Sequence, residues 1–146
     1  MKRLIYSLAF VVSVAAAGTP AFAQQSGGLK IEFQGPGGHS SGAYGRVSAL
    51  HAAARAVILI QQALPSGSYQ ITNLTGGNSV NAIASDGLIE LKLTAGSAKA
   101  YQALVAAVTK AAAEGAAAEN AFRGVKAGDL TSGAPATVRS SVTPLK

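Results

Sequence analysis

Two glycine-bounded segments contain the residues of this chain that are best suited to contact a ligand. The first, at 35–42, reads Gly-Pro-Gly-Gly-His-Ser-Ser-Gly and contains His39. Glycines allow the backbone to approach a ligand closely, and an imidazole can donate or accept a hydrogen bond near neutral pH. The segment lacks the Gly-Lys-Ser/Thr ending of a phosphate-binding loop and the glycine spacing of a dinucleotide-binding loop. It therefore indicates either a polar contact made by His39 or an ordinary turn with a solvated imidazole.

The second segment, at 76–83, reads Gly-Gly-Asn-Ser-Val-Asn-Ala-Ile. Gly76 and Gly77 favour a turn, because glycine adopts the backbone angles that tight turns require. The side-chain amide of Asn81 is suited either to contacting a ligand or to closing that turn.

Few residues of this chain could form a catalytic or metal-binding site. The sequence has two His, no Cys and six acidic residues, whereas a zinc enzyme needs three or four converging ligands and a general base. His51 falls in an alanine-rich segment, where we expect an ordinary helix residue, and we expect Glu32, Glu90 and Glu114 to face solvent. No His-x-Asp pair, Glu-Glu pair or Gly-x-Ser-x-Gly nucleophile motif is present. We therefore expect no metal bound by this chain and no complete catalytic site, although residue counts alone do not exclude a Ser-His-acid triad.

Periodic apolar residues predict the strands that carry these segments. Strict alternation of apolar and polar residues predicts a half-buried strand at 29–34, and related patterns predict strands at 68–75 and 88–93. A fourth strand is expected within 122–130. The strand at 68–75 is polar enough to lie at a sheet edge. Its two faces are predicted to be Tyr69, Ile71 and Asn73 on one side and Gln70, Thr72 and Leu74 on the other.

Two alanine-rich helices are predicted between these strands, because Ala is the strongest helix former. The first spans 47–63 and ends at Pro65-Ser66-Gly67. The second follows Ser97, a suitable N-cap, and runs from 98 to 113 or as far as 120. Residue spacing predicts the core-facing stripes Leu50, Ala54, Val57, Ile58 and Leu64 in the first helix, and Tyr101, Leu104, Val105 and Val108 in the second.

The resulting order, β-α-β-β-α-β, predicts an α+β fold. Two helices of this length on a four-stranded antiparallel sheet make a two-layer sandwich of ferredoxin-like type. Right-handed crossovers place both helices on one face of the sheet. The second and fourth strands then lie at the edges.

The ends of the chain are predicted to lie outside this domain. Residues 1–23 have the basic start, the apolar run and the Ala21-Phe22-Ala23 site of a secretory signal peptide, with cleavage after Ala23. The alternative is an uncleaved anchor, although the apolar run is shorter than the roughly 20 residues that span a bilayer. We expect a secreted or periplasmic protein that has no membrane contact after cleavage. The remaining chain is predicted to be a flexible leader at 24–28, a domain at 29–130 and a flexible tail at 131–146.

The net charge of +6 gives little indication of a partner. Basic residues are scattered and aromatic residues are few, so no basic stripe with interleaved aromatics is present. We expect no nucleic-acid partner.

In combination and in this order, the two segments resemble parts of the dimerisation, or lid, domain of the bacterial zinc exopeptidases. That family includes aminoacylase, carboxypeptidase G, tripeptide aminopeptidase and succinyl-diaminopimelate desuccinylase. The resemblance runs from Leu29 to Asn120. It is carried by Gly-Pro-Gly-Gly-His-Ser at 35–40, Tyr44-Gly45, the alanine-rich helix through Ala56, the run at 76–85 and Ala-Glu-Asn at 118–120.

The resemblance implies a β-α-β-β-α-β domain that forms a homodimer through a helix and a sheet edge. It implies that His39 reaches the active site of the partner subunit and contacts the substrate and its developing oxyanion, which suits a positioned donor. It also implies that Asn81 contacts the substrate and that Gly76 and Gly77 form the turn carrying it. Zinc would be held only by the separate catalytic domain of that family, which this sequence does not contain.

Two departures from the family pattern stand out. Lys92-Leu93-Thr94-Ala95 occupies the positions where the family often has acidic-x-Arg-Ser, and the missing Arg argues against peptide binding. The run at 128–133 reads Gly-Asp-Leu-Thr-Ser-Gly, where the family usually has Gly-Asp-Arg-Pro-x-Gly before its catalytic domain.

The leading hypothesis is a non-catalytic, exported dimerisation domain that forms homodimers or docks onto a full-length metallopeptidase. One alternative is a fragment of a zinc-dependent amide-bond hydrolase whose catalytic domain is missing. Another is a small module that binds peptides through His39 and Asn81.

Overall fold

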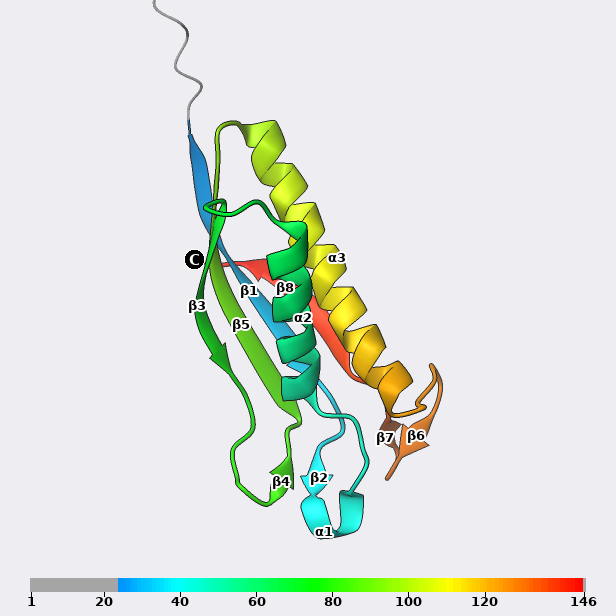
Figure 1. The fold of residues 1–146 in the computed structure, drawn as a ribbon. Coiled ribbons are helices and arrows are strands. Elements are labelled where there is room, and N and C mark those ends of the chain that lie inside the picture. Colours follow the sequence, from blue (N-terminus) through cyan, green and yellow to red (C-terminus); the bar gives the residue numbers. More distant parts are fainter. Residues whose placement is uncertain (1–23, 146) are drawn as a thin grey trace, which may run out of the picture.

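A four-stranded antiparallel sheet with two long helices on one face forms the body of the protein. The computed structural model describes residues 24–145, so the predicted signal peptide lies outside the described residues. The strands lie in the order β3-β5-β1-β8, and α2 and α3 cover the same face (Figure 1). The bounds of these elements are β1 Gln25–Gln34, α2 Ala49–Ala63, β3 Tyr69–Thr75, β5 Asp86–Ala95, α3 Ala98–Phe122 and β8 Arg139–Pro144. The predicted two-layer sandwich is confirmed, with its second and fourth long strands at the edges.

Shorter elements lie beyond one end of the sheet, below the lower ends of α2 and α3 in Figure 1. Two small antiparallel ladders form there, one between β2 and β4 and the other between β6 and β7. The bounds are β2 Gly38–His39, α1 Ser40–Ala43, β4 Ala82–Ile83, β6 Leu130–Thr131 and β7 Ala134–Pro135. The first ladder joins the two glycine-bounded segments.

The core lies between the sheet and the two helices. Large side chains come from β1 and β5, whereas α2 contributes mainly alanines. The fully buried apolar side chains include Ile31, Ile89, Leu91 and Leu93 from the sheet, Ala52, Ala53, Ala56 and Ile60 from α2, and Val108 and Ala112 from α3.

The predicted core stripe of α2 is therefore wrong at three of its five residues. Leu64 is buried and Val57 packs against the core, but Leu50 is only half-buried, Ala54 is exposed and Ile58 is 53% exposed. The reason lies in α3, which packs so closely against α2 that only small side chains fit between them. A Cβ atom on Gly115 of α3 would lie 2.8 Å from the carbonyl oxygen of Ala52. The alanine face of α2 consequently packs inward together with Ile60, whereas Leu50 and Ile58 face outward.

The second helix confirms its predicted start and stripe. Ser97 caps α3 by accepting a hydrogen bond from the Ala100 N–H at 3.2 Å. Val108 is buried, and Tyr101, Leu104 and Val105 pack against the core. Because α3 continues to Phe122, the strand predicted within 122–130 does not form there, and the fourth strand of the sheet is β8.

Both segments predicted to be flexible contribute strands to the sheet. Gln25–Gly28 of the predicted leader belongs to β1, and Gly27 lies beneath the hydroxyl of Tyr101. In the predicted tail, β8 pairs with β1 from Leu29 to Gln34. The side chain of Asn120 fixes the start of this segment, because its amide accepts from the Val138 N–H at 2.8 Å and donates to the Val138 carbonyl at 3.0 Å. The predicted domain limits of 29 and 130 are thus too narrow.

The edge strand β3 contains a bulge at Thr72, where the register against β5 shifts. Ile71 faces Leu91, but Asn73 faces Glu90 and donates to its carboxylate at 3.4 Å. A bulge inserts one residue and so reverses the alternation of faces beyond it. The predicted grouping of Asn73 with Ile71 is therefore wrong, and Leu74 lies on the helix-covered face.

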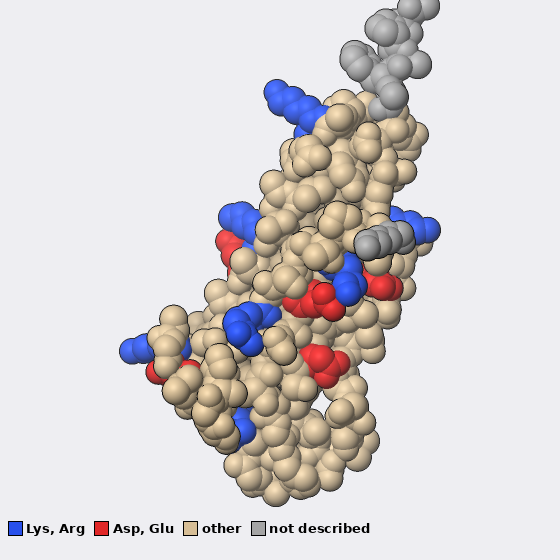
Figure 2. Space-filling view, turned by 180° about the vertical axis from the view of Figure 1, so that it is seen from behind, with Lys and Arg blue, Asp and Glu red and all other residues tan. Residues whose placement is uncertain are grey.

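No helix of the described residues covers the opposite face of the sheet. Lys, Arg, Asp and Glu side chains are scattered over it, with both signs interspersed (Figure 2). Lys30 and Glu32, for example, form an ion pair of 2.9 Å. No helix among residues 24–145 is long and apolar enough to cross a membrane.

Candidate functional site

The short β2–β4 ladder brings together the two polar residues that the sequence singled out. His39 is paired in register with Ala82, and the Ser40 N–H donates to the Asn81 carbonyl at 2.8 Å. The side-chain nitrogen Nδ2 of Asn81 lies 3.1 Å from Nε2 of His39. The predicted pair is therefore assembled from loops that are far apart in the sequence.

Both ring nitrogens of His39 have partners within these loops. Its Nδ1 lies 2.8 Å from the Ser41 hydroxyl and 3.3 Å from the Ser41 backbone nitrogen, as expected for the N-cap of α1. Because the Ser41 N–H donates to Nδ1, the ring proton of a neutral His39 is on Nε2. Nε2 then donates to Asn81, whose amide must be rotated by half a turn so that its oxygen faces the ring. A ligand that uses Nε2 must displace Asn81.

Gly76 and Gly77 form the turn by which the chain leaves β3. Gly77 has a φ of 72°, in the left-handed region that favours glycine. A Cβ atom on Gly76 would lie 3.0 Å from the Cα atom of Gly87 on β5. Both glycines are thus required by the backbone path, and any contact with a ligand would be made by their main chain.

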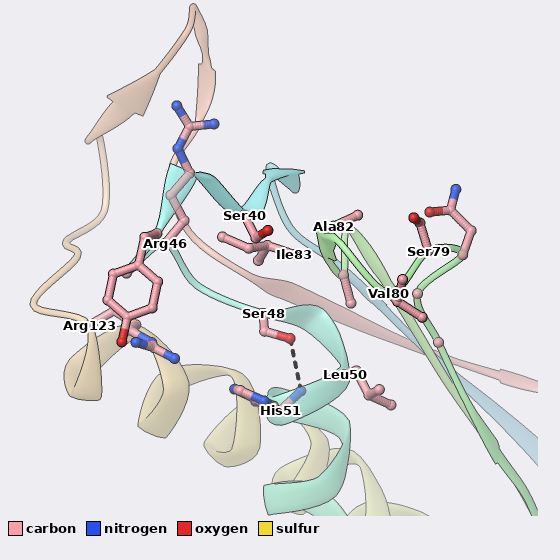
Figure 3. Close-up of a pocket in the computed structure, with 16 residues that line it drawn as sticks. Ser40, Arg46, Ser48, Leu50, His51, Ser79, Val80, Ala82, Ile83 and Arg123 are labelled. Carbon is pink, nitrogen blue, oxygen red and sulfur yellow. Dashed lines mark hydrogen bonds between the residues drawn. The ribbon is translucent and has the colours of Figure 1, made fainter. Parts of the chain in front are cut away.

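A cleft of about 660 Å³ separates the first turn of α2 from the two loops (Figure 3). His39 and Asn81 are not among its lining residues, although their neighbours Ser40 and Ala82 are. The lining consists of Ser40, Tyr44, Gly45, Arg46, Ser48, Leu50, His51, Gly76, Gly77, Asn78, Ser79, Val80, Ala82, Ile83, Ala84 and Arg123. The cleft and the His39–Asn81 pair are therefore adjacent but separate.

A fully buried carboxylate, Glu119 of α3, fixes the first turn of α2 beside this cleft. Its Oε1 accepts from the Ser48 N–H at 3.1 Å and from Arg123 Nε at 3.3 Å, and its Oε2 accepts from Arg55 Nε at 3.1 Å. Burial by itself would raise the pKa of Glu119. These hydrogen bonds, together with His51 whose Nδ1 lies 3.7 Å away, instead hold its pKa below the ordinary value.

Sequence reasoning did not identify this role for Glu119. The available signal was its position, because Val108, Ala112, Gly115 and Glu119 follow one another at helical spacing on the face of α3 that packs inward. A carboxylate at such a position needs positively charged partners. Arg55 and Arg123 supply them, and both guanidinium groups also lie 5.0 Å from the centre of the Phe122 ring.

Comparison with known families identifies the domain. The model of the family described as "Peptidase dimerisation domain" matches residues 24–120, about two thirds of the chain. This chain belongs to the peptidase dimerisation domain family. No curated protein sequence matches it significantly.

Solved structures share the fold of this peptidase dimerisation domain. An aminobenzoyl-glutamate utilization protein from Klebsiella pneumoniae is 17% identical with a TM-score of 0.64, covering 87% of this chain and 31% of its own. A hydantoinase/carbamoylase family amidase from Burkholderia ambifaria is 18% identical with a TM-score of 0.61, and the match covers 86% of this chain and 29% of the amidase. A tripeptidase from Staphylococcus aureus is 16% identical with a TM-score of 0.60, and the match covers 83% of this chain and 29% of the tripeptidase. The chain thus spans less than a third of the length of each.

The two departures from the family pattern lie in different parts of the dimerisation domain. Lys92–Ala95 forms the end of β5 that is remote from the loops, and the rise per residue of a strand places Thr94 about 27 Å from Asp86 at the other end. An Arg at that position would therefore not reach the cleft beside His39. The run at 128–133 contains β6 and the turn that joins it to β7, and Asp129, just before β6, accepts from the Lys126 N–H at 2.7 Å.

The described residues of the dimerisation domain do not provide a zinc site. Among residues 24–145, no three His, Cys, Asp or Glu side chains come together. The neighbours of His39 are an amide and a hydroxyl, and the carboxylate nearest to His51 is Glu119, which is already bonded to two arginines. Zinc requires three or four such ligands around one point, so the chemistry of a zinc hydrolase does not fit these side chains.

Proposed function

We propose that this chain is an exported, non-catalytic dimerisation domain that pairs with a second copy of itself or docks onto a full-length metallopeptidase. The observation that supports pairing most strongly is the edge formed by β3 together with α2. Strand β3 has β5 on one side only. At this edge, the large apolar side chains of Ile58 on α2 and Leu74 on β3 are 53% and 43% exposed.

The sequence of β3 lacks most of the features that prevent edge strands from pairing. Edge strands are usually protected by charged side chains, by proline or by a bulge. Tyr69–Thr75 contains no charged residue and no proline, and the bulge at Thr72 is its only such feature. The other edge, β8, begins with Arg139 and ends with Pro144. Pairing is therefore favoured at β3.

The outer face of α2 extends this edge. Figure 1 shows α2 on the β3 side of the sheet and α3 on the β8 side. The half-buried or exposed residues Leu50, Ala54 and Ile58 lie on the side of α2 opposite the alanines that contact α3. Two strands paired edge to edge, with two helices meeting above them, would bury these side chains and remove apolar surface from water.

In such a dimer, the loops that carry His39 and Asn81 would extend toward a catalytic domain. The two residues would contact its substrate, as the family resemblance implies. Zinc would belong to that domain and not to this chain.

Sedimentation equilibrium tests the dimer directly. We expect dimers at tens of micromolar, and we expect Ile58→Asp and Leu74→Lys to produce monomers with unchanged circular dichroism. Leu130→Lys is the matched control, because Leu130 is also an exposed apolar residue but lies on the β6–β7 hairpin. A wild-type protein that stays monomeric, or variants that still dimerise, would contradict the proposal. Recovery of a metallopeptidase in a pull-down would separate docking from homodimerisation.

A second candidate is a fragment of a zinc-dependent amide-bond hydrolase. It is supported by the coverage of the solved structures, since the matched part is less than a third of each. Reading the coding sequence on either side distinguishes the two candidates. The chain alone is expected to show no peptidase activity with or without zinc, and turnover abolished by His39→Ala would contradict this.

A further candidate is a module that binds small peptides through His39 and Asn81, supported by their contact across the β2–β4 ladder.

Export to the periplasm or the exterior, with cleavage after Ala23, is part of the proposal as well. N-terminal sequencing of the exported protein should begin at Gln24.

A further inference from the structure

We propose that Gln24 is a site of covalent modification, at which the first residue of the exported chain closes into an uncharged pyroglutamyl ring. The inference rests on the proposed export, because only cleavage after Ala23 gives Gln24 a free α-amino group. It concerns the N-terminus of the chain and depends neither on the dimer nor on the two glycine-bounded segments.

Gln24 lies just outside the folded sheet. It is exposed, and β1 begins at the next residue, Gln25. The register against β5 also starts at Gln25, which faces Ala95. The ladder therefore fixes the residue after Gln24 but neither the side chain nor the α-amino group of Gln24 itself. These two groups can approach each other without disturbing the sheet.

The chemistry needs only these two groups. The unprotonated α-amino nitrogen of Gln24 attacks the side-chain carbon Cδ, and the new N–Cδ bond closes a five-membered lactam. The Cδ–Nε2 bond breaks, and Nε2 leaves as ammonia with one proton from the attacking nitrogen. No oxidant, reductant or further reactant is required. The pKa of an ordinary α-amino group lies close to neutral pH, so part of the population is unprotonated in a neutral compartment.

The acidic side chains of the described sheet lie too far away to hold this amino group in its charged form. Asp and Glu are absent from Gln25–Gly28 of β1, from Lys92–Ala95 of β5 and from the first turn of α3. Farther along the sheet, Glu90 faces Lys30, and the rise of a strand places Lys30 about 20 Å from Gln24. An ion pair with a carboxylate would favour the ammonium form. Without such a partner nearby, the amine stays available for ring closure.

The ring would protect the start of β1 from trimming. Enzymes that remove residues one at a time from an N-terminus bind the free α-amino group, which the ring no longer offers. If Gln24 were removed, the next residues to be lost would be Gln25 and Ser26, which pair with Ala95 and Thr94. Ring closure also removes one positive charge from this end of the molecule.

Mass spectrometry of the exported protein tests the proposal. The full chain is expressed in a bacterial host that exports it, and the purified protein and its N-terminal peptide are both measured. We expect residues 24–146 with a mass lower by one molecule of ammonia. Fragment ions should place that loss at Gln24, because Edman degradation gives no residue from a blocked N-terminus.

The outcomes separate the ring from the export. A chain that begins at Gln24 but keeps its ammonia and a free α-amino group would overturn the modification and leave the export intact. A chain that begins at another residue would refute both the predicted cleavage site and the ring in the exported protein.

A second preparation tests the chemistry independently of export. Residues 24–146 are released from a fusion protein by a protease that leaves Gln24 as the first residue, and the folded chain is kept at neutral pH. The ring should accumulate with time as the free α-amino group disappears. Gln24→Asn is the matched control, because its amide is one carbon shorter and would have to close a strained four-membered ring, so its N-terminal peptide should lose no ammonia. If Gln24 stays open in this preparation, the proposal fails.

Discussion

Replacing Glu119 with glutamine should lower the free energy of unfolding by about 2–3 kcal/mol at neutral pH. The substitution keeps the size of the side chain and one oxygen that can accept from the Ser48 N–H. It removes the negative charge and places an amide NH₂ group opposite one of the arginine nitrogens. The loss therefore arises from the contacts with Arg55 and Arg123, and little of it from packing.

The magnitude follows from the exposure of the partners. Removing one member of a fully buried ion pair costs about 3–5 kcal/mol. Glu119 is fully buried, but the side chains of Arg55 and Arg123 are 37% and 24% exposed and regain water when the carboxylate is lost. Solvent screening reduces each contact accordingly. The expected loss is thus smaller than for a buried pair and larger than for a surface pair, which contributes about 0–1 kcal/mol.

Urea denaturation at several pH values tests both the size and the origin of the effect. The pKa of Glu119 is below its ordinary value of 4.5 in the folded protein. The stabilisation by its carboxylate is therefore fully present above that value and is lost as the pH falls through the folded-state pKa. Wild type and Glu119→Gln should differ most at pH 7 and should converge in acid.

Glu114→Gln provides the matched control on the same helix. Glu114 pairs with Lys110 at 2.8 Å, and both side chains are largely exposed. Its loss should change the stability by less than about 0.5 kcal/mol. The reasoning is refuted if Glu119→Gln is as mild as this control, or if its effect is the same at pH 7 and in acid.

Two further predictions concern packing and the C-terminal strand. Gly115→Ala should destabilise the protein by about 1–2 kcal/mol in urea denaturation, because a Cβ atom 2.8 Å from the Ala52 carbonyl oxygen outweighs the roughly 1 kcal/mol of helix propensity that Ala gains. In the control Gly96→Ala, the new Cβ atom meets nothing within 4 Å, so the free energy of unfolding should change by less than about 0.5 kcal/mol. A Gly115→Ala variant more stable than the wild type would show that the helices are less tightly packed. Asn120→Ala should lower the free energy of unfolding by about 2–3 kcal/mol and speed amide exchange in β8, because both backbone groups of buried Val138 lose their hydrogen-bond partner. Unchanged amide exchange in β8 would contradict this prediction.

The sequence predicted those parts of the fold that depend on local periodicity. Alternating residues located β1 and β5, and Ser97 located the start of α3, because each pattern reflects one strand face or one cap. Hydrophobic size is a poor guide to most of the core face of α2. At that face, the close approach of α3 at Gly115 makes small residues the buried ones.

Features that depend on distant partners could not be predicted in this way. The segment at 139–144 is rich in Ser and Thr and forms β8 only because β1 offers it a free edge and Asn120 holds Val138. The bulge at Thr72 depends on the register against β5. Similarly, the resemblance singled out His39 and Asn81, whereas the cleft and the partners of Glu119 emerged only once α2, α3 and the loops were placed together.

Amide hydrogen exchange at two protein concentrations tests most directly the claim that β3 is the pairing edge. If the edges of two copies pair, the outward-facing amides of Tyr69–Thr75 should exchange more slowly at about 100 µM than at about 1 µM, as mass action requires. Those of Arg139–Pro144, on the opposite edge, should exchange at the same rate at both concentrations. Exchange in β3 that does not depend on concentration, or protection that appears at β8 instead, would contradict the account.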